Sequence, residues 1–182
     1  HWGLNLKYAT QKVPGGIAQA ITIAEDFIDN DAFALILGDN LFYGSNLSND
    51  LRPDLSQHGA HVFGIEVVDP RRYGVLELDM DGNLVSVEEK PQTPKSNLAM
   101  PGIYFFDETA PELVRQLKPS KRGELEITDL IQLYLEGNGV NVTKLPAGTT
   151  WMDMGTFDSL IDAGQFVKVM ETRQGLTIGA PG

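Results

Sequence analysis

Leu35-Ile36-Leu37-Gly38-Asp39-Asn40 is the segment from which the rest of the chain can be interpreted. Its apolar run is too short for a helix and ends in a glycine followed by a carboxylate, which is typical of a buried central strand. Ligands of open α/β sheets bind outside the carboxyl ends of the strands, so we predict that Asp39 reaches a crevice there. An Asp at this point can equally cap a following helix through its side-chain oxygen, and this segment alone leaves both interpretations open.

The composition is that of a globular protein with an acidic surface. The chain has 182 residues, of which 42% are hydrophobic, enough for one domain with a substantial core. Its 14 basic and 25 acidic residues give a formal charge of −11, which disfavours nucleic acid and anionic membrane surfaces as partners. Mononucleotides remain compatible with this charge, because a divalent cation can bridge carboxylates to phosphates.

Other residue types narrow the chemistry further. The absence of cysteine excludes disulfides and thiolate catalysis. The histidines His1, His58 and His61 lack the spacing of a zinc site, and we interpret the last two as surface residues. No apolar run is long enough to span a membrane and no signal peptide opens the chain, so we expect a cytoplasmic protein. The chain starts without methionine and runs directly into a strand-like segment, which suggests a start inside a domain.

Hydrophobic periodicity predicts strands and helices in alternation over the first half of the chain. Leu4–Ala9 alternates like a strand, Gly16–Phe27 has the spacing of an amphipathic helix, and Ala32–Leu37 is the central strand. This strand–helix–strand order predicts a parallel pair of strands with a right-handed crossover. Further predicted elements are a helix over Leu47–Gln57, a β-rich segment over His61–Val68, and a hairpin of Gly74–Leu78 and Leu84–Glu88 across Asp81-Gly82.

The second half of the chain continues the alternation. Strands are predicted over Gly102–Phe106 and Val140–Leu145, a short strand or an extended loop over Thr150–Asp153, and helices over Thr109–Leu117, Thr128–Glu136 and Asp158–Thr172. The last helix is expected to face inward through Leu160, Ile161, Phe166, Val167 and Met170, and the tail Gly175–Gly182 is expected to fray. Parallel and hairpin strands mixed with helices indicate an α/β domain with layered helices.

Two carboxylates lie at the ends of apolar or aromatic runs. Asp39 follows the first apolar run, and Asp153 follows Trp151-Met152 and precedes Gly155-Thr156. If distant strands bring both carboxylates to one place, they form a clamp for magnesium, which prefers one or two carboxylates together with phosphate oxygens and water. The alternative for Asp153 is a structural turn before the last helix.

Two further segments combine residues suited to nucleotide or sugar binding. In Glu88-Glu89-Lys90-Pro91, Lys90 can bind a phosphate as a point charge and Glu89 can accept hydrogen bonds from sugar hydroxyls. The alternative is a solvated charge cluster at a strand end. Gln11 precedes Pro14-Gly15-Gly16, where glycines permit close approach to a flat ligand and the amide can pair with a nucleobase. The alternative is an ordinary turn.

Together these segments identify a resemblance. The chain resembles the glucose-1-phosphate thymidylyltransferases, members of the sugar nucleotidyltransferase family. The matching segments run in family order over nearly the whole chain, which makes the series far more specific than any one of them. They are Trp2-Gly3-Leu4-Asn5-Leu6, Gly16-Ile17-Ala18-Gln19-Ala20, Leu37-Gly38-Asp39-Asn40-Leu41-Phe42-Tyr43-Gly44, Asp69-Pro70 with Arg72-Tyr73-Gly74-Val75, Glu88-Glu89-Lys90-Pro91, Gly102-Ile103-Tyr104-Phe105, Arg122-Gly123-Glu124-Leu125-Glu126-Ile127-Thr128-Asp129 and Trp151-Met152-Asp153-Met154-Gly155-Thr156.

The resemblance implies a three-layer, Rossmann-like mixed sheet and a reaction of dTTP with glucose 1-phosphate that gives dTDP-glucose and pyrophosphate. It implies Asp39, Lys90 and Asp153 as catalytic residues, with Mg²⁺ held by the two aspartates and the sugar phosphate contacted by the lysine. The substrate-binding positions that it implies are Gly74, Glu89 and Met100 for the sugar, Gln11 and Gly16 for thymine, and Pro14, Ile17, Leu37, Asp39, Tyr73, Lys90, Thr128 and Trp151 around the substrates.

The chain departs from this family at its ends. It lacks the opening βα unit with the Gly-Gly-x-Gly-Thr-Arg-Leu loop that cradles the triphosphate, and it stops short of the family's C-terminal helices. We therefore expect residues 1–182 to form a single nucleotidyltransferase domain that is incomplete at both ends. Alone, the chain is expected to have weak or no activity.

Other functions stay open at this point. One is a nucleotidyltransferase that uses UTP or another sugar 1-phosphate, and another is a non-catalytic module that binds nucleotide sugars. The resemblance further implies a homotetramer and a place in the supply of dTDP-deoxysugars such as dTDP-rhamnose.

Overall fold

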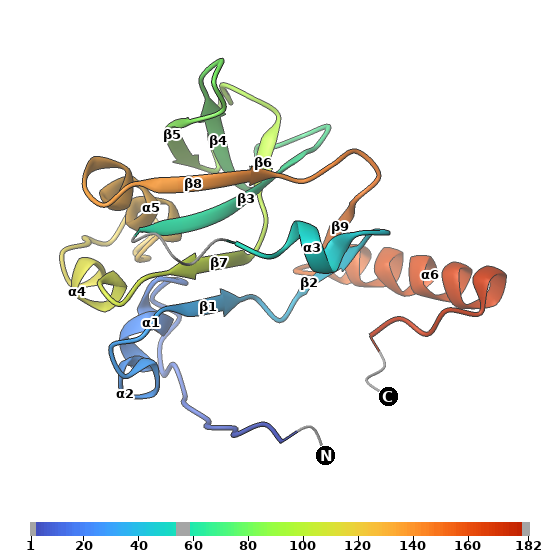
Figure 1. Ribbon diagram of the computed structural model, residues 1–182, viewed down its shortest axis with the longest axis horizontal. Coiled ribbons are helices and arrows are strands. Elements are labelled where there is room, and N and C mark those ends of the chain that lie inside the picture. Colours follow the sequence, from blue (N-terminus) through green and yellow to red (C-terminus); the bar gives the residue numbers. More distant parts are fainter. Residues whose placement is uncertain (1–2, 54–58, 180–182) are drawn as a thin grey trace.

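Within residues 3–53 and 59–179, which the computed structural model describes, a mixed sheet of seven strands forms the centre of the molecule (Figure 1). Its strands run in the order β1-β7-β3-β6-β4-β5, and β8 pairs with β3. They are β1 (Phe33–Ile36), β3 (Ala60–Glu66), β4 (Gly74–Leu78), β5 (Leu84–Glu89), β6 (Leu98–Met100), β7 (Ile103–Phe106) and β8 (Val140–Lys144). A separate two-stranded sheet contains β2 (Asn40–Tyr43) and β9 (Thr150–Asp153).

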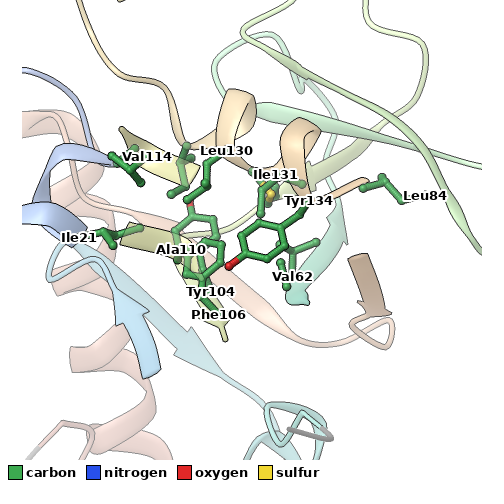
Figure 2. Close-up of a cluster of buried hydrophobic side chains, with 14 of the residues drawn as sticks. Ile21, Val62, Leu84, Tyr104, Phe106, Ala110, Val114, Leu130, Ile131 and Tyr134 are labelled. Atoms are coloured by element: carbon green, nitrogen blue, oxygen red, sulfur yellow. The ribbon is translucent and has the colours of Figure 1, made fainter. Parts of the chain in front are cut away.

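Four of the described helices contribute buried residues to a core on one face of the large sheet. The described helices are α1 (Gln19–Ile23), α2 (Glu25–Ile28), α3 (Leu47–Asp50), α4 (Ala110–Val114), α5 (Ile127–Glu136) and α6 (Phe157–Gln174). The apolar stripe of α5 places Leu130, Ile131 and Tyr134 in the core with no exposed surface, and Ile21 of α1 and Val114 of α4 join them (Figure 2). The ring of Tyr134 stacks on Phe106 of β7 at a centroid distance of 5.6 Å.

A second, smaller core lies on the other side of the sheet. Its buried members are Phe63, Ile65, Ala99, Ile103 and Leu145, and the partly buried Phe42 of β2 and Trp151 of β9 pack against them. Figure 1 shows β2, β9 and α6 together at one end of the molecule, beyond β1. The predicted α/β architecture with a mixed sheet and layered helices is therefore confirmed.

The predicted connection of the first two strands is wrong. Residues 4–9 form no strand, and Leu4, Leu6 and Tyr8 are exposed, Tyr8 to 91%. Alternation indicates only a capacity to form a strand, and none of the described elements pairs with this segment. In consequence β1 has no parallel partner here and pairs antiparallel with β7. The sheet's parallel pair is instead β3 with β8.

The prediction that β1 is a buried central strand is also wrong for this structure. Among the described elements β1 has one neighbour and stands at the end of the sheet. Phe33 and Leu35 face the core, whereas Ala34 and Ile36 face solvent, with 61% of Ile36 exposed. An apolar run does not distinguish a central strand from an edge strand, because the difference lies in its neighbours.

The predicted helices and hairpin have mixed outcomes. The hairpin across Asp81-Gly82 is confirmed as β4 and β5. The helix predicted over 16–27 is broken at Ala24 into α1 and α2. In α6 the predicted inward residues Leu160 and Ile161 are 53% and 57% exposed, and Ala163 is the buried residue, because α6 rests on β9 through a narrow face. Positions 54–57 of the predicted third helix, His1, His58 and 180–182 of the tail lie outside the described residues.

Candidate active site

The two predicted carboxylates meet because a short sheet joins their strands. After β1, Leu37 donates its N–H to the carbonyl of Gly102 at 2.9 Å, and the chain turns through Gly38 and Asp39 into β2. The first residue of β2, Asn40, is the register partner of Asp153 in β9. The N–H of Met154 donates to the carbonyl of Asp39 at 2.7 Å, which ties the two turns together.

Gly155 leaves a small space that both carboxylates border. A Cβ atom built on Gly155 would lie 3.1 Å from Oδ1 of Asp153 and 3.7 Å from Oδ2 of Asp39. Two carboxylates beside such a space fit a hard divalent cation such as Mg²⁺. In the described part of the chain no group of three or more His, Cys, Asp or Glu side chains could hold a metal, so water and substrate oxygens would have to complete the coordination.

An open pocket of about 220 Å³ lies beside these carboxylates. It receives side chains from both sheets, from the α5 N-terminus and from the segment before α1. Its lining residues are Ile17, Leu37, Asp39, Asn40, Arg72, Tyr73, Gly74, Glu89, Lys90, Met100, Gly102, Tyr104, Ile127, Trp151 and Asp153. Ten of the positions implied by the resemblance therefore line one pocket, although they come from separate parts of the chain.

Glu89 is the partly buried carboxylate at the end of β5. It accepts a hydrogen bond from Oγ1 of Thr128 at 3.3 Å, and a guanidinium nitrogen of Arg122 lies 3.4 Å from its other oxygen. Burial, reinforced by the nearby carboxylate of Glu126, raises the pKa of Glu89 despite the opposing charges of Lys90 and Arg122. A carboxylate held in this way has acceptor capacity for hydroxyl groups of a ligand in the pocket.

The pocket wall at Gly74 has no room for a side chain. A Cβ atom there would lie 2.9 Å from Cγ2 of Thr128 and 3.2 Å from Cε of Met100. Thr128 is buried on the first turn of α5 and does not line the pocket, so it supports Gly74 from the side away from the pocket. Apolar atoms of Thr128 and Met100 therefore close the pocket wall at Gly74, and the carboxylate of Glu89 supplies a polar group beside it.

Lys90 has a strained backbone. Its φ of +45° lies in the left-handed region, which residues other than glycine rarely adopt, and its N–H donates to the carbonyl of Tyr73 at 3.0 Å. The ammonium group lies 3.8 Å from Oε1 of Glu89, and the side chain is 45% exposed. The strain is consistent with a turn shaped to direct this cation, which gives the pocket a flexible positive charge beside its carboxylates.

An aromatic pair closes another side of the pocket. The rings of Tyr73 and Trp151 lie 4.7 Å apart at 58°, and the guanidinium of Arg72 lies 5.9 Å from the Tyr73 ring centroid. A nitrogen of the same guanidinium lies 3.9 Å from Oδ2 of Asp153. Arg72 therefore places a second cation at the carboxylate end of the pocket.

The predicted base-binding segment lies outside this lining. Nε2 of Gln11 donates to the carbonyl of Gly16 at 3.1 Å and to Oε1 of Gln19 at 2.6 Å, and Gln11 and Pro14 are exposed. Gly16 has a φ of +101°, and any Cβ there would collide with the backbone of Leu125. The segment is thus anchored to the chain before α5, next to the lining residue Ile17.

Five lining residues were not predicted from the sequence: Asn40, Arg72, Gly102, Tyr104 and Ile127. All five lie inside segments that match the family, and Asn40 and Arg72 are also neighbours of the predicted Asp39 and Tyr73, so membership of a matched segment was a usable signal. Tyr104 and Ile127 are buried apolar residues whose pattern is that of any core position, and no local signal separates them from the core.

Comparison with known families decides what kind of protein this is. The model of the nucleotidyl transferase family matches residues 1–169. The chain belongs to the nucleotidyl transferase family. No described helix of this family member is long and apolar enough to cross a membrane.

Two curated relatives have the same name. A glucose-1-phosphate thymidylyltransferase of Mycolicibacterium smegmatis is 52% identical over 180 residues, which are 99% of this chain and 62% of that protein. That of Mycobacterium tuberculosis H37Rv is 49% identical over 181 residues, which are 100% of this chain and 63% of that protein. The chain is thus a partial homologue that spans somewhat over three fifths of these relatives' length.

Solved structures of nucleotidyl transferases share the fold. A putative glucose-1-phosphate thymidylyltransferase from Bacillus anthracis, in complex with sucrose, is 37% identical with a TM-score of 0.76 and covers 91% of this chain and 66% of that one. A UDP-glucose pyrophosphorylase complexed with UDP-glucose has the same TM-score at 23% identity, covering 92% of this chain and 66% of that one, which shows likeness of fold alone.

Proposed function

We propose that this chain is the larger part of a glucose-1-phosphate thymidylyltransferase. In the proposed reaction a phosphate oxygen of glucose 1-phosphate attacks the α-phosphorus of dTTP. The bond from that phosphorus to the bridging oxygen breaks, pyrophosphate leaves with its electron pair, and dTDP-glucose forms. The observation that carries the proposal is the pairing of Asp39 and Asp153 beside one pocket that also contains Lys90 and Glu89.

In this proposal the protein mainly positions and neutralises charge, as phosphoryl-type transfer requires. Asp39 and Asp153 hold Mg²⁺, which when bound would offset charge on the phosphates. Lys90 holds the sugar phosphate as a compact point charge. The ammonium group and the metal would then face the phosphates from within one pocket.

The remaining site residues divide between the sugar and the base. Glu89 accepts hydrogen bonds from sugar hydroxyls, and Gly74, Met100 and Thr128 shape the wall against the ring. The base is assigned to the segment before α1 and its neighbours, and the aromatic pair bounds the pocket beside them. The proposed base and boundary positions are Gln11, Pro14, Gly16, Ile17, Leu37, Tyr73 and Trp151.

The nucleotide is proposed to be dTTP because the curated relatives at 49–52% identity are named as thymidylyltransferases. UTP is the competing nucleotide, and few contacts decide between the two bases. A homotetramer, a cytoplasmic location and a role in supplying dTDP-deoxysugars are further proposals that rest on the resemblance. Residues 1–182 are proposed to belong to one domain.

Release of pyrophosphate from dTTP and glucose 1-phosphate with Mg²⁺ tests the function, with UTP in a parallel assay. The complete natural protein is expected to turn over dTTP faster than UTP. The 182-residue chain is expected to show little turnover, because its sequence has no Gly-Gly-x-Gly-Thr-Arg-Leu loop. Calorimetric titration of the chain with dTDP-glucose then separates binding from catalysis.

Two results would count against these proposals. Binding of dTDP-glucose by the complete protein without any turnover would favour a non-catalytic nucleotide-sugar-binding module. Turnover by the 182-residue chain at the rate of the complete protein would refute the expected weakness of the chain alone.

A further inference from the structure

Asn40 connects three separate parts of the site through its side-chain amide. Its Oδ1 accepts a hydrogen bond from the backbone N–H of Gly102 at 3.0 Å and another from Nε1–H of Trp151 at 2.6 Å. Its Nδ2 donates to Oδ1 of Asp39 at 2.9 Å. One residue therefore links the turn before β7, the strand β9 and the carboxylate that follows β1.

The two donors determine which way the amide of Asn40 points. A backbone N–H and an indole N–H can only donate, so the atom that faces both must be the oxygen. The nitrogen must then face Asp39, where it is a donor to a carboxylate. Gly102 is held by the N–H of Leu37, which donates to its carbonyl, and Trp151 packs against the second core, so groups other than Asp39 impose this orientation.

The carboxylate of Asp39 depends on its hydrogen bond from Asn40, whereas the carboxylate of Asp153 has other partners. It is exposed at a turn, and among the described residues Asn40 is the donor to its carboxylate. Asp153 is held twice, by the N–H of Gly155 at 3.1 Å and by the guanidinium of Arg72 at 3.9 Å. An exposed Asp side chain without support has several rotamers, and only some of them would face the space beside Gly155.

We propose that Asn40 is a positioning residue that fixes the carboxylate of Asp39 toward the cation and couples it to the indole of Trp151. The inference rests on the proposed metal role of Asp39. Partners of metal ligands typically change metal affinity about 10–100-fold when they are removed. The coupling adds a consequence that a merely structural residue would lack: the indole N–H should sense whether a cation is bound.

Direct metal binding tests the inference without any turnover. Mn²⁺ affinity of the 182-residue chain is measured by electron paramagnetic resonance for the wild type and for Asp39→Ala, Asn40→Leu and Trp151→Phe. Asn40→Leu keeps the branched shape of the side chain but removes all three hydrogen bonds, and we expect about a tenfold loss of affinity. Asp39→Ala is expected to lose more, and Trp151→Phe, which removes one donor from Oδ1, to lose less.

The matched control is Asn141→Leu, the same substitution at an exposed residue of β8. It is expected to keep the wild-type affinity. In a Trp2→Phe background, the indole N–H resonance of Trp151 is followed by ¹H–¹⁵N NMR as Mg²⁺ is added. We expect a Mg²⁺-dependent shift in this background, and its loss when Asn40→Leu, but not Asn141→Leu, is added.

The outcomes separate the two proposals. If Asp39→Ala lowers Mn²⁺ affinity while both Asn40→Leu and Trp151→Phe bind like the wild type, Asn40 does not position Asp39 and the inference is overturned. If Asp39→Ala itself binds Mn²⁺ like the wild type, the metal assignment fails and the inference fails with it. If Asn40→Leu does not fold, Trp151→Phe decides by the same criterion.

Discussion

The α5 core and the small β2–β9 sheet are built on different principles. In α5, Leu130, Ile131 and Tyr134 have no exposed surface, whereas every residue of β2 and β9 is partly exposed. Burial of apolar area is the main source of folding free energy, and directional hydrogen bonds fix where a polar group points. Apolar burial in the α5 core therefore supplies most of the stability, and hydrogen bonds in the β2–β9 sheet set the geometry of the site. Mutations in the core should change stability without changing the site, and mutations in the site should do the reverse.

The core also contains a polar cluster around Asp107, which is not among the pocket-lining residues. The buried carboxylate of Asp107 accepts hydrogen bonds from the hydroxyl of Tyr134 at 2.7 Å, from the N–H of Gly59 at 2.7 Å and from Thr109. Burial alone would raise the pKa of Asp107, but these hydrogen bonds outweigh it and lower the pKa. The carboxylate form is therefore the one that the folded protein favours.

Replacing Asp107 should give the largest effect on the core. Asp107→Ala leaves the Tyr134 hydroxyl and the Gly59 N–H without their acceptor, at a cost of about 3 kcal/mol in the free energy of unfolding. Because the folded state lowers this pKa, the contribution is present above the ordinary value of 3.8 and is lost as the pH falls through the lowered value. Urea unfolding at pH 7 and at pH 3 should show the difference between the two proteins narrowing in acid, and a constant difference would contradict this account.

A smaller effect, confined to the site, is expected from Gly155→Ala. The new Cβ would lie 3.1 Å from Oδ1 of Asp153, so the carboxylate must move by a few tenths of an ångström. We expect about a tenfold loss of pyrophosphate release by the complete protein, equivalent to about 1.4 kcal/mol, with an unchanged unfolding midpoint. Gly164→Ala is the matched control, since a Cβ there meets nothing within 4 Å. Equal activity of both variants would show that the space beside Gly155 is not used.

The smallest expected effect is that of Glu89→Gln, which should stabilise the folded protein slightly instead of destabilising it. Burial raises the pKa of Glu89, so the folded state is penalised as the pH rises from the ordinary value of 4.5 through the raised value. Glu89→Gln removes the charge and should raise the melting temperature slightly at pH 7, with no gain at pH 4, while binding of glucose 1-phosphate weakens. Calorimetry at both pH values checks this, and a melting temperature at pH 7 below that of the wild type would contradict it.

The sequence predicted those elements whose structure depends on residues close together in the chain. The Asp81-Gly82 turn fixed the hairpin, and the apolar stripe of Thr128–Glu136 predicted α5 to within a residue. The position of β1 and the state of residues 4–9 depend on which strands pair across long distances in the chain, and alternation carries no information about that. The same limit explains why Leu160 and Ile161 of α6 were wrongly placed inside.

The residues of the site likewise divide into those that sequence motifs identify and those that long-range pairing brings in. Asp39 and Asp153 could be named from motif resemblance, and pairing of Asn40 with Asp153 explains why they meet. The orienting role inferred for Asn40 could not be predicted, because its partners Gly102 and Trp151 lie 62 and 111 residues away. The pairing of strands in two sheets brings Gly102 and Trp151 to Asn40, and no pattern in the nearby sequence indicates this.

Crystallography with Mn²⁺ and dTDP-glucose tests the central claim, that the second sheet brings two distant carboxylates to one cation. The expected result is an anomalous peak within coordination distance of both Asp39 and Asp153, about 2.0–2.3 Å from an oxygen of each. A peak bound by neither carboxylate, in crystals where the nucleotide sugar is visible in the pocket, would contradict it.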